Sequence, residues 1–251
     1  MKENLVIIGI STTAATILKF VQHYQLYNVL GFSVNRSYLT VDEYCGLPVY
    51  PIEELDSIIN KENDRIFVAM QWNKLNAERR SVYERLKCEG WHFANLVSPH
   101  AVVNGQIIGD NCWIADNAII DFGATIGNDV YVKIAAFVAD NTTVHDHCFI
   151  GAKSTIGGGC TIGEQTFVGL NSTIFDCTTI GRKCLVGACT IVKRNLPDFT
   201  RCKTSSDSCE IKQFGEYEIE SKLMFKKNVR SLTSMLGGVI RTCPENNWRA
   251  A

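Results

Sequence analysis

A six-residue period between residues 102 and 192 constrains the fold of this chain more than any other feature. Ile or Val stands at the same position of every hexad across this stretch. The aliphatic residues are Val102, Ile108, Ile114, Ile120, Ile126, Val132, Val138, Val144, Ile150, Ile156, Ile162, Val168, Ile174, Ile180, Val186 and Val192. A helix repeats every 3.6 residues and a strand every 2, so neither period explains the series. A repeat of six is typical of a parallel β-helix.

Two further columns of residues follow the same period. The fourth residue after the aliphatic position is small in Cys112, Ala118, Ala124, Ala136, Thr142, Cys148, Ser154, Cys160, Thr166, Ser172, Thr178, Cys184 and Thr190. Gly often follows the aliphatic residue directly, as at Gly109, Gly127, Gly151, Gly157, Gly163, Gly169, Gly181 and Gly187. We predict that the aliphatic side chains fill a three-sided column and that the small residues relieve crowding beside its corners. Gly or Asn would take turns with positive φ.

Three hexads would make one triangular coil, and each strand would pair with strands one coil above and below. About five coils, spaced by about 4.8 Å, would give a column about 25 Å long. Each coil would contact only its neighbours, so both ends of the column need a covering segment.

Composition limits the kinds of partner. The 251 residues have a formal net charge of −1, which gives no electrostatic reason to expect nucleic acid or an acidic membrane surface. No apolar run has the length of a transmembrane helix, and the first four residues lead into a strand rather than a signal peptide. We therefore expect a soluble cytoplasmic protein.

The 11 cysteines do not indicate disulfides or a zinc site. Their number is odd, no Cys-x-x-Cys pair occurs, and Cys112, Cys148, Cys160 and Cys184 belong to the small-residue column. We expect buried free thiols in a reducing compartment.

The residues before the repeat alternate between strand and helix patterns. Strands are predicted over 5–8, 29–33, 65–70 and 92–96, and helices over 14–23, 51–59 and 77–89. This order indicates a parallel α/β domain of Rossmann type over residues 1–97. The column would follow over 98–199, and an extension over 200–251 would hold one amphipathic helix at about 216–236.

Several segments resemble, in the right order, the bacterial sugar O-/N-acyltransferases. They are Leu-Val-Ile-Ile-Gly at 5–9, Gly-Leu-Pro-Val at 46–49, Phe-Val-Ala at 67–69, Asn-Leu-Val-Ser-Pro at 95–99 and Asn-Leu-Pro-Asp at 195–198. That family includes sialic acid O-acetyltransferases and nucleotide-amino-sugar N-acetyltransferases. The resemblance covers about residues 4–200 and implies a Rossmann-like α/β domain followed by a left-handed β-helix.

The resemblance also implies a function. Its members transfer an acyl group from acyl-CoA, expected here to be acetyl-CoA, to a sugar or nucleotide-linked sugar in surface polysaccharide or glycan biosynthesis. They form homotrimers in which CoA lies between neighbouring columns. By position in the hexads, the CoA-binding residues would be Gly158, Leu170 and Ala188, with Lys193 and Arg194 near the CoA phosphates. Ordinary solvated charges are the alternative for that basic pair.

The nucleotide-binding segments of the family are altered in this chain. The family has a glycine-rich turn after the first strand and acidic residues after the second. This chain has Gly9 followed by Ile-Ser-Thr-Thr, and Asn35 after the second strand. The resemblance then places the substrate near Gly9, Ser11, Thr12, Thr13 and Asn35, where hydroxyls and helix N-terminal amides would hold phosphate. A purely structural role for this domain is the alternative, and NAD binding is not expected.

The catalytic histidine of the family is replaced. The matching position, two residues after an aliphatic one, is Asp140. In one interpretation Asp140 is the base, which requires burial to raise its pKa. In a second, His145 or His147 is the base, or the amine arrives neutral and the departing thiolate takes the proton. In a third, catalysis is lost and the protein is a binding or assembly subunit.

Loss of this histidine favours N-acylation, because a hydroxyl needs a base more than a neutral amine does. O-acetylation of a sugar hydroxyl remains the alternative reaction. A metal enzyme of the carbonic anhydrase type shares the column fold, but it needs a third ligand about two coils from His145 and His147. No histidine stands at that spacing, so no metal is expected.

Overall fold

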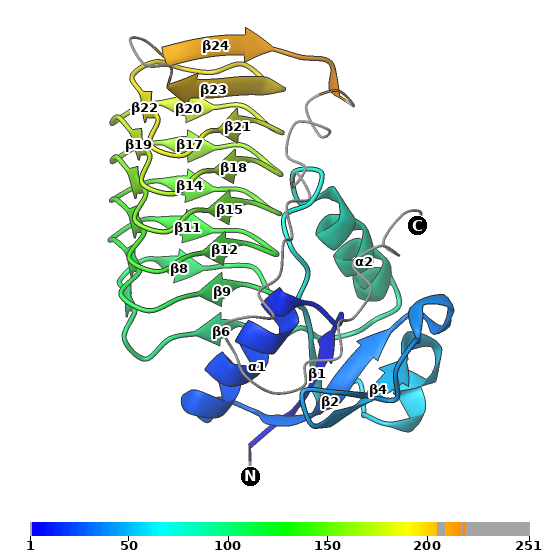
Figure 1. The fold of residues 1–251 in the computed structure, drawn as a ribbon. Coiled ribbons are helices and arrows are strands. Elements are labelled where there is room, and N and C mark those ends of the chain that lie inside the picture. Colours follow the sequence, from blue (N-terminus) through cyan, green and yellow to red (C-terminus); the bar gives the residue numbers. More distant parts are fainter. Residues whose placement is uncertain (1, 205–208, 217, 219–251) are drawn as a thin grey trace, which may run out of the picture.

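The computed structural model describes residues 2–204, 209–216 and 218. An α/β domain at the N-terminus packs against one side of a three-sided column of short strands (Figure 1). The helix predicted over 216–236 lies outside the described residues, apart from 216 and 218. No described helix has both the length and the apolar character needed to span a membrane.

The α/β domain contains a five-stranded sheet with strand order β3-β4-β2-β1-β5. Its strands are β1 (Asn4–Ile8), β2 (Asn28–Val34), β3 (Glu43–Tyr44), β4 (Leu47–Pro51) and β5 (Arg65–Val68). Its helices are α1 (Thr12–His23) and α2 (Ala77–Cys88), with 3-10 helices η1 (Arg36–Tyr38) and η2 (Ile52–Ser57). Strand β3 alone is antiparallel to its neighbour, so the remaining four strands form the parallel sheet that the alternating pattern predicts.

The strands predicted over 5–8, 29–33 and 65–70 and the helices over 14–23 and 77–89 are confirmed to within two residues at each end. Two predictions differ. The helix predicted over 51–59 is the shorter 3-10 helix η2. Residues 92–96 do not form a strand of this sheet, because only Phe93 pairs with it, through Ile66. The last residue of that range, Leu96, begins β6 (Leu96–Val97), which pairs with the column.

The column has three sheets, which we number by their order in the first coil; all their strands are parallel except the last strand of the first sheet. The first sheet contains β6, β9 (Trp113–Ile114), β12 (Tyr131–Val132), β15 (Phe149–Ile150), β18 (Phe167–Val168), β21 (Leu185–Val186), β23 (Thr200–Thr204) and β24 (Cys209–Gln213). The second contains β7 (Val102–Val103), β10 (Ile119–Ile120), β13 (Phe137–Val138), β16 (Thr155–Ile156), β19 (Thr173–Ile174) and β22 (Ile191–Val192). The third contains β8 (Gln106–Ile107), β11 (Thr125–Ile126), β14 (Thr143–Val144), β17 (Thr161–Ile162) and β20 (Thr179–Ile180).

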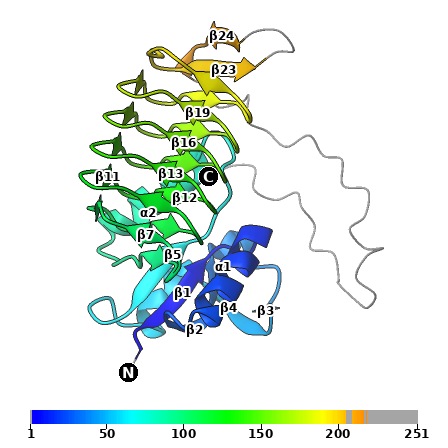
Figure 2. The ribbon, with the colours of Figure 1, turned by 90° about the vertical axis from the view of Figure 1, so that its left-hand side faces the viewer.

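The antiparallel pair β23 and β24 lies at the end of the column away from the α/β domain (Figure 2). Cys202 of β23 is buried within the column core. This pair therefore covers one end of the hydrophobic interior.

The aliphatic series fills the interior from Ile114 to Val192, where each member is at most 2% exposed. The prediction is wrong for its first two members. Val102 is 47% exposed and Ile108 is 68% exposed. In the first coil, the residue that pairs with the next coil's aliphatic position lies one residue later than predicted in one strand and one residue earlier in the other. Val103 pairs with Ile120, and Ile107 pairs with Ile126. A shift of one residue turns a strand side chain to the opposite face, so these neighbours point inward instead.

The small-residue column is buried as predicted, and it also supplies hydrogen-bond donors. The Thr142 hydroxyl donates to the carbonyl of Gly157 (2.7 Å), and the Cys148 thiol donates to that of Gly163 (3.1 Å). Burial raises the pKa of the Cys148 thiol to about 12, which keeps it a neutral donor. The nine cysteines up to Cys202 are free thiols.

The prediction that Gly or Asn takes the turns with positive φ is confirmed for Asn and wrong for the glycines directly after the aliphatic position. Positive φ occurs at the third residue after that position, as at Asn141 (φ 54°), and non-glycine residues other than Asn also adopt it, as at Lys153 (φ 57°). The glycine that follows the aliphatic residue has no positive φ. It is needed for close stacking, because a Cβ at Gly169 would lie 2.5 Å from the Ala188 nitrogen of the next coil.

Gly169→Ala is expected to lower the free energy of unfolding by about 2–3 kcal/mol, because the atoms it meets belong to the backbone. Gly187 is a matched control in the same column, where the nearest atom to an added Cβ is Lys203 Cβ at 3.2 Å. Gly187→Ala should cost less than about 1 kcal/mol. Urea denaturation of both variants measures the difference. Equal losses would contradict the stacking explanation.

Candidate functional site

The first sheet of the column faces the α/β domain through a row of aromatic side chains. Phe149 and Phe167 stack with ring centroids 4.8 Å apart, and Trp72 lies 4.8 Å from Phe149. Two coils nearer the start of the column, the ring centroid of Trp113 lies 5.8 Å from that of Phe20 in α1. Thr12 at the start of α1 accepts a hydrogen bond from Gln71, which precedes Trp72 in sequence. Helix α1 therefore lies along this sheet, and its N-terminal end points toward the coils that come later in the sequence.

A buried ion pair fixes α2 to the column. Arg79 and Asp129 are both fully buried, and Arg79 Nε lies 2.9 and 3.0 Å from the two carboxylate oxygens. Arg79 Nη2 also donates to the Asp129 carbonyl (2.8 Å). Asn111 Nδ2 donates to Asp129 Oδ1 (2.6 Å), and His147 Nδ1 lies 3.0 Å from Oδ2. Three side chains, from both domains, thus meet at one carboxylate.

His147 belongs to this interface. Its side chain is buried, its carbonyl accepts a hydrogen bond from Asn76 (2.8 Å), and its ring lies 5.5 Å from that of Tyr83. The Nε2 atom faces Glu84 at 3.7 Å. This histidine, a candidate base in the sequence, is therefore enclosed between α2 and the column rather than placed on an open corner.

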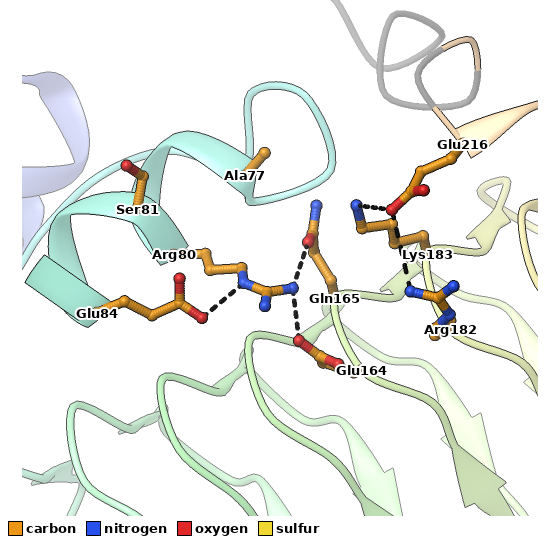
Figure 3. A pocket seen from close by; sticks show the side chains of 9 residues that line it. All are labelled: Ala77, Arg80, Ser81, Glu84, Glu164, Gln165, Arg182, Lys183 and Glu216. Carbon is orange, nitrogen blue, oxygen red and sulfur yellow. Dashed lines mark hydrogen bonds and ion pairs between the residues drawn. The ribbon is translucent and has the colours of Figure 1, made fainter. Parts of the chain in front are cut away.

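Charged side chains line a hollow of 330 Å³ between α2 and the higher coils (Figure 3). Arg80 contacts Glu84 at 2.8 Å and Glu164 at 2.5 Å. Glu216 lies 2.8 Å from Lys183, and this contact lowers the pKa of the glutamate. The charges pair with one another across the hollow. We interpret it as part of the interface between α2 and the column.

The five substrate-binding candidates lie where β1 and β2 end. Gly9 has φ 111°, and its amide donates to the Ser33 carbonyl (2.7 Å). The Ser11 hydroxyl caps α1 by accepting from the Ala14 amide (3.2 Å) and donates to the Ala69 carbonyl (3.3 Å). In the described part of the chain, the backbone amides of Thr12 and Thr13 have no acceptor. These are the unpaired amides of a helix N-terminus, where an anion is favoured.

Asn35 has a partner in α2. Its Oδ1 accepts a hydrogen bond from Arg85 Nη2 (2.8 Å), which connects the end of β2 to that helix. Its predicted contact with a ribose stays a prediction.

The other candidates are divided among three edges of the column, which we name by the sheets that they join. The first–second edge comprises residues 115–118, 133–136, 151–154, 169–172 and 187–190. The second–third edge comprises 121–124, 139–142, 157–160 and 175–178. The third–first edge comprises 108–112, 127–130, 145–148, 163–166 and 181–184, and α2 covers part of it.

Leu170 and Ala188 lie one coil apart on the first–second edge, and both are exposed. Asp140 and Gly158 lie one coil apart on the second–third edge. Strand β22 ends at the second–third edge, where exposed Lys193 and Arg194 follow it. Lys193 Nζ lies 5.5 Å above the Phe175 ring. His145 and His147 are on the third–first edge. One copy of the chain therefore does not gather these candidates in one place.

Asp140 is exposed, and its Oδ2 accepts a hydrogen bond from Asn141 Nδ2 (2.9 Å). A single copy therefore lacks the burial that a carboxylate base requires. His145 is also exposed. No group of three His, Cys, Asp or Glu residues among those described could hold a metal ion.

Sequence reasoning missed Lys133. It begins the first–second edge after β12, and its Nζ lies 3.2 Å from the centroid of the Trp113 ring. Burial, followed by the charge of Arg79, lowers the pKa of Lys133 to about 7. The signal in the sequence was its position: the equivalent residues on the other coils are Ala115, Gly151, Gly169 and Gly187.

Comparison with known proteins identifies the repeat. The family model for the bacterial transferase hexapeptide (six repeats) matches residues 141–176. The model for the hexapeptide repeat of succinyl-transferase matches residues 106–133 and 159–194. No curated protein sequence matches the chain.

Solved structures share the whole arrangement. The H141N mutant of perosamine N-acetyltransferase from Caulobacter crescentus, in complex with CoA and GDP-perosamine, has a TM-score of 0.73 and 24% identity. That match covers 84% of this chain and 97% of the other. The acetyltransferase domain of PglB from Neisseria gonorrhoeae FA1090, in complex with acetyl coenzyme A, has a TM-score of 0.72 and 21% identity. That match covers 84% of this chain and 99% of the PglB domain.

WeeI from Acinetobacter baumannii AYE is similar at a TM-score of 0.54 and 17% identity, over 83% of this chain and 99% of its own. At these identities the likeness establishes the fold. It is a left-handed β-helix of hexapeptide repeats that follows an N-terminal α/β domain, as the sequence predicts.

Proposed function

We propose that this protein transfers an acetyl group from acetyl-CoA to an amino group of a nucleotide-linked sugar. The observation that carries the proposal is the joining of two parts within one chain. One is a helix N-terminus with unpaired amides at the carboxyl edge of a parallel sheet. The other is a hexapeptide column with an edge of Gly and Ala residues beside that domain. Solved structures with this arrangement include complexes with CoA and with GDP-perosamine, which supports the same pairing of substrates here.

The acyl donor fits the first–second edge. Gly151, Ala152, Gly169, Gly187 and Ala188 place small residues on this edge over successive coils. Leu170, exposed among them, would contact the pantetheine chain. The Gly and Ala positions of the edge begin beside the coil of Lys133, near the α/β domain, and continue toward the end of the column where Lys193 and Arg194 follow β22 on the second–third edge. Those two cations would meet the CoA phosphates.

A homotrimer would bring the separated candidates together. Exposed apolar residues flank the second sheet on both sides, with Ile134 and Leu170 on one edge and Phe122 and Phe175 on the other. A cyclic trimer joins two different surfaces of each copy, so the first–second edge of one copy would face the second–third edge of the next. Asp140 and Gly158 of one copy would then border the groove opposite Leu170 of its neighbour.

The reaction needs little beyond positioning and one proton transfer. The acceptor nitrogen attacks the thioester carbonyl, the C–S bond breaks, and the amine proton ends on the CoA sulfur. Holding both reactants in one groove removes much of the entropic cost. An amine that is neutral attacks without the strong base that a hydroxyl requires. We expect the protein to act in the cytoplasm, in the assembly of a surface polysaccharide or another glycan.

The test is a transfer assay with acetyl-CoA and a panel of acceptors. The panel contains GDP-perosamine, UDP-linked amino sugars, free amino sugars and the matching hydroxy-sugars. We expect a product heavier by one acetyl group only from nucleotide-linked amino sugars, detected by mass spectrometry, and a trimeric mass by light scattering. Acetylation of the hydroxy-sugars alone would establish O-acetylation instead. CoA binding without any product would favour a binding subunit.

A further inference from the structure

Lys133 lies where the two proposed binding surfaces meet. It is the first residue of the first–second edge on the coil that carries Tyr131, so the Gly and Ala positions of the proposed CoA groove begin directly above it. On its other side, its Nζ lies 3.2 Å from the centroid of the Trp113 ring, which Phe20 of α1 contacts. Helix α1 is the helix whose N-terminus would hold the nucleotide phosphates.

The amine of Lys133 has no hydrogen bond or ion pair with any described residue; its contact is the face of the indole ring. The titratable groups on the surrounding elements are Lys19 and His23 of α1, Arg79 of α2, and Asp116 and Asp129 of the column. Arg79 saturates the Asp129 carboxylate, and Asp116 faces the Tyr24 hydroxyl. No carboxylate among the described residues therefore pairs with this lysine, which is only partly exposed.

These surroundings favour the neutral amine. Removing an ammonium from water without a paired anion disfavours the charged form, and here it lowers the pKa of Lys133 to about 7. A lysine at its ordinary pKa near 10.4 would have roughly one amine in 2,500 neutral at pH 7. Lys133 would have about half of its population neutral under the same conditions. A base suited to neutral pH has this property.

We propose that Lys133 is the general base of the acyl transfer, in place of the histidine that the resembling acyltransferases carry. This inference rests on the proposed function. As the acceptor nitrogen bonds to the acyl carbon, its proton passes to the free electron pair of Lys133 Nζ, which becomes an ammonium. The C–S bond then breaks, and the ammonium returns the proton to the CoA thiolate. Lysine and enzyme are restored, and the products are the N-acetyl sugar and CoA thiol.

The activity test compares Lys133→Met and Lys133→Arg with Lys2→Met. Lys2 is exposed and precedes β1, at the end of that strand opposite the proposed phosphate site, and it has no role in the proposed site. Loss of a general base should lower kcat/KM by roughly 100-fold or more in both Lys133 variants. The Kd for CoA should change less than about twofold, and Lys2→Met should match the wild type. Wild-type kcat/KM should fall below pH 7, and the Arg variant should lose this dependence. A Lys133→Met enzyme with near wild-type activity overturns the proposal.

A second test needs no acceptor. Trace labelling with acetic anhydride at pH 7, read by peptide mass spectrometry, should modify Lys133 faster than the exposed Lys2, and saturating CoA should protect Lys133 but not Lys2. Labelling of Lys133 that CoA does not slow would overturn its place in the groove, whatever the acceptor. If CoA protects Lys133 but no nucleotide-linked amino sugar is acetylated, the proposed acceptor is wrong while the position of Lys133 in the groove is supported.

Discussion

Arg79→Met is expected to lower the free energy of unfolding by about 3–5 kcal/mol, more than any other single substitution considered for stability. The guanidinium and the Asp129 carboxylate are both fully buried, so the variant leaves an anion in the interior with only Asn111 and His147 as partners. The Met side chain has nearly the length of Arg but neither its charge nor its donors. The Asp129 and Cys148 carbonyls would also lose their contacts with Nη2.

Arg182→Met is the matched control for this prediction. Arg182 also pairs with an aspartate through Nε, at 3.0 Å from Asp198, but each side chain of that pair is 47% exposed. An exposed pair contributes at most about 1 kcal/mol. Urea denaturation of the two variants, followed by far-ultraviolet circular dichroism, should separate them clearly. Adding Asp129→Leu to Arg79→Met should recover part of the loss, because the unpaired anion is removed. Similar midpoints for Arg79→Met and Arg182→Met would contradict a structural role for the buried pair.

The column was predictable because its information is repeated. Each coil places the same residue types in the same environment, so Ile114 and Val192 are buried for the same reason although they are 13 hexads apart in sequence. The predicted burial of the aliphatic residues fails only in the first coil, where the regular repeat begins. In the first coil the register shifts, and Val103 rather than Val102 points inward.

The contacts between domains were not predictable from the same pattern. Arg79 and Asp129 are 50 positions apart, and each has an ordinary alternative as a solvated charge on a helix or a turn. His147 occupies the hexad position of a positive-φ turn, where a polar side chain normally faces solvent. Only the placement of α2 over that edge turns it into a buried partner of Asp129. Sequence periodicity therefore predicts the fold of the column but not the contacts that the α/β domain makes with it.

The candidate site was predicted in part for a similar reason. Leu170 and Ala188 could be placed on one edge because they are 18 residues apart, which is one full coil. The same arithmetic separates them from Asp140 and His145, which lie on the other two edges. Lys133 shares an edge with the predicted CoA residues, but its lowered pKa arises from burial beside Trp113 and the charge of Arg79. That burial depends on how the α/β domain packs against the column.

Ala188→Trp is expected to raise the Kd for CoA by roughly a hundredfold, about 2.7 kcal/mol, and to remove acetyl transfer at ordinary donor concentrations. Ala188 is exposed on the first–second edge, so an indole there would fill the proposed pantetheine path without entering the column interior. The melting temperature should therefore stay close to that of the wild type. Isothermal titration with CoA and thermal denaturation measure the two effects separately.

Arg182→Trp tests whether the effect belongs to this edge. Arg182 is 47% exposed and lies at nearly the same height on the column, but it is on the third–first edge, which does not border the proposed groove. It should leave the Kd for CoA within about twofold of the wild type, since no part of the donor would pass there. If Arg182→Trp weakened CoA binding and Ala188→Trp did not, the donor would lie along the third–first edge. The Gly and Ala positions of the first–second edge would then serve coil stacking alone.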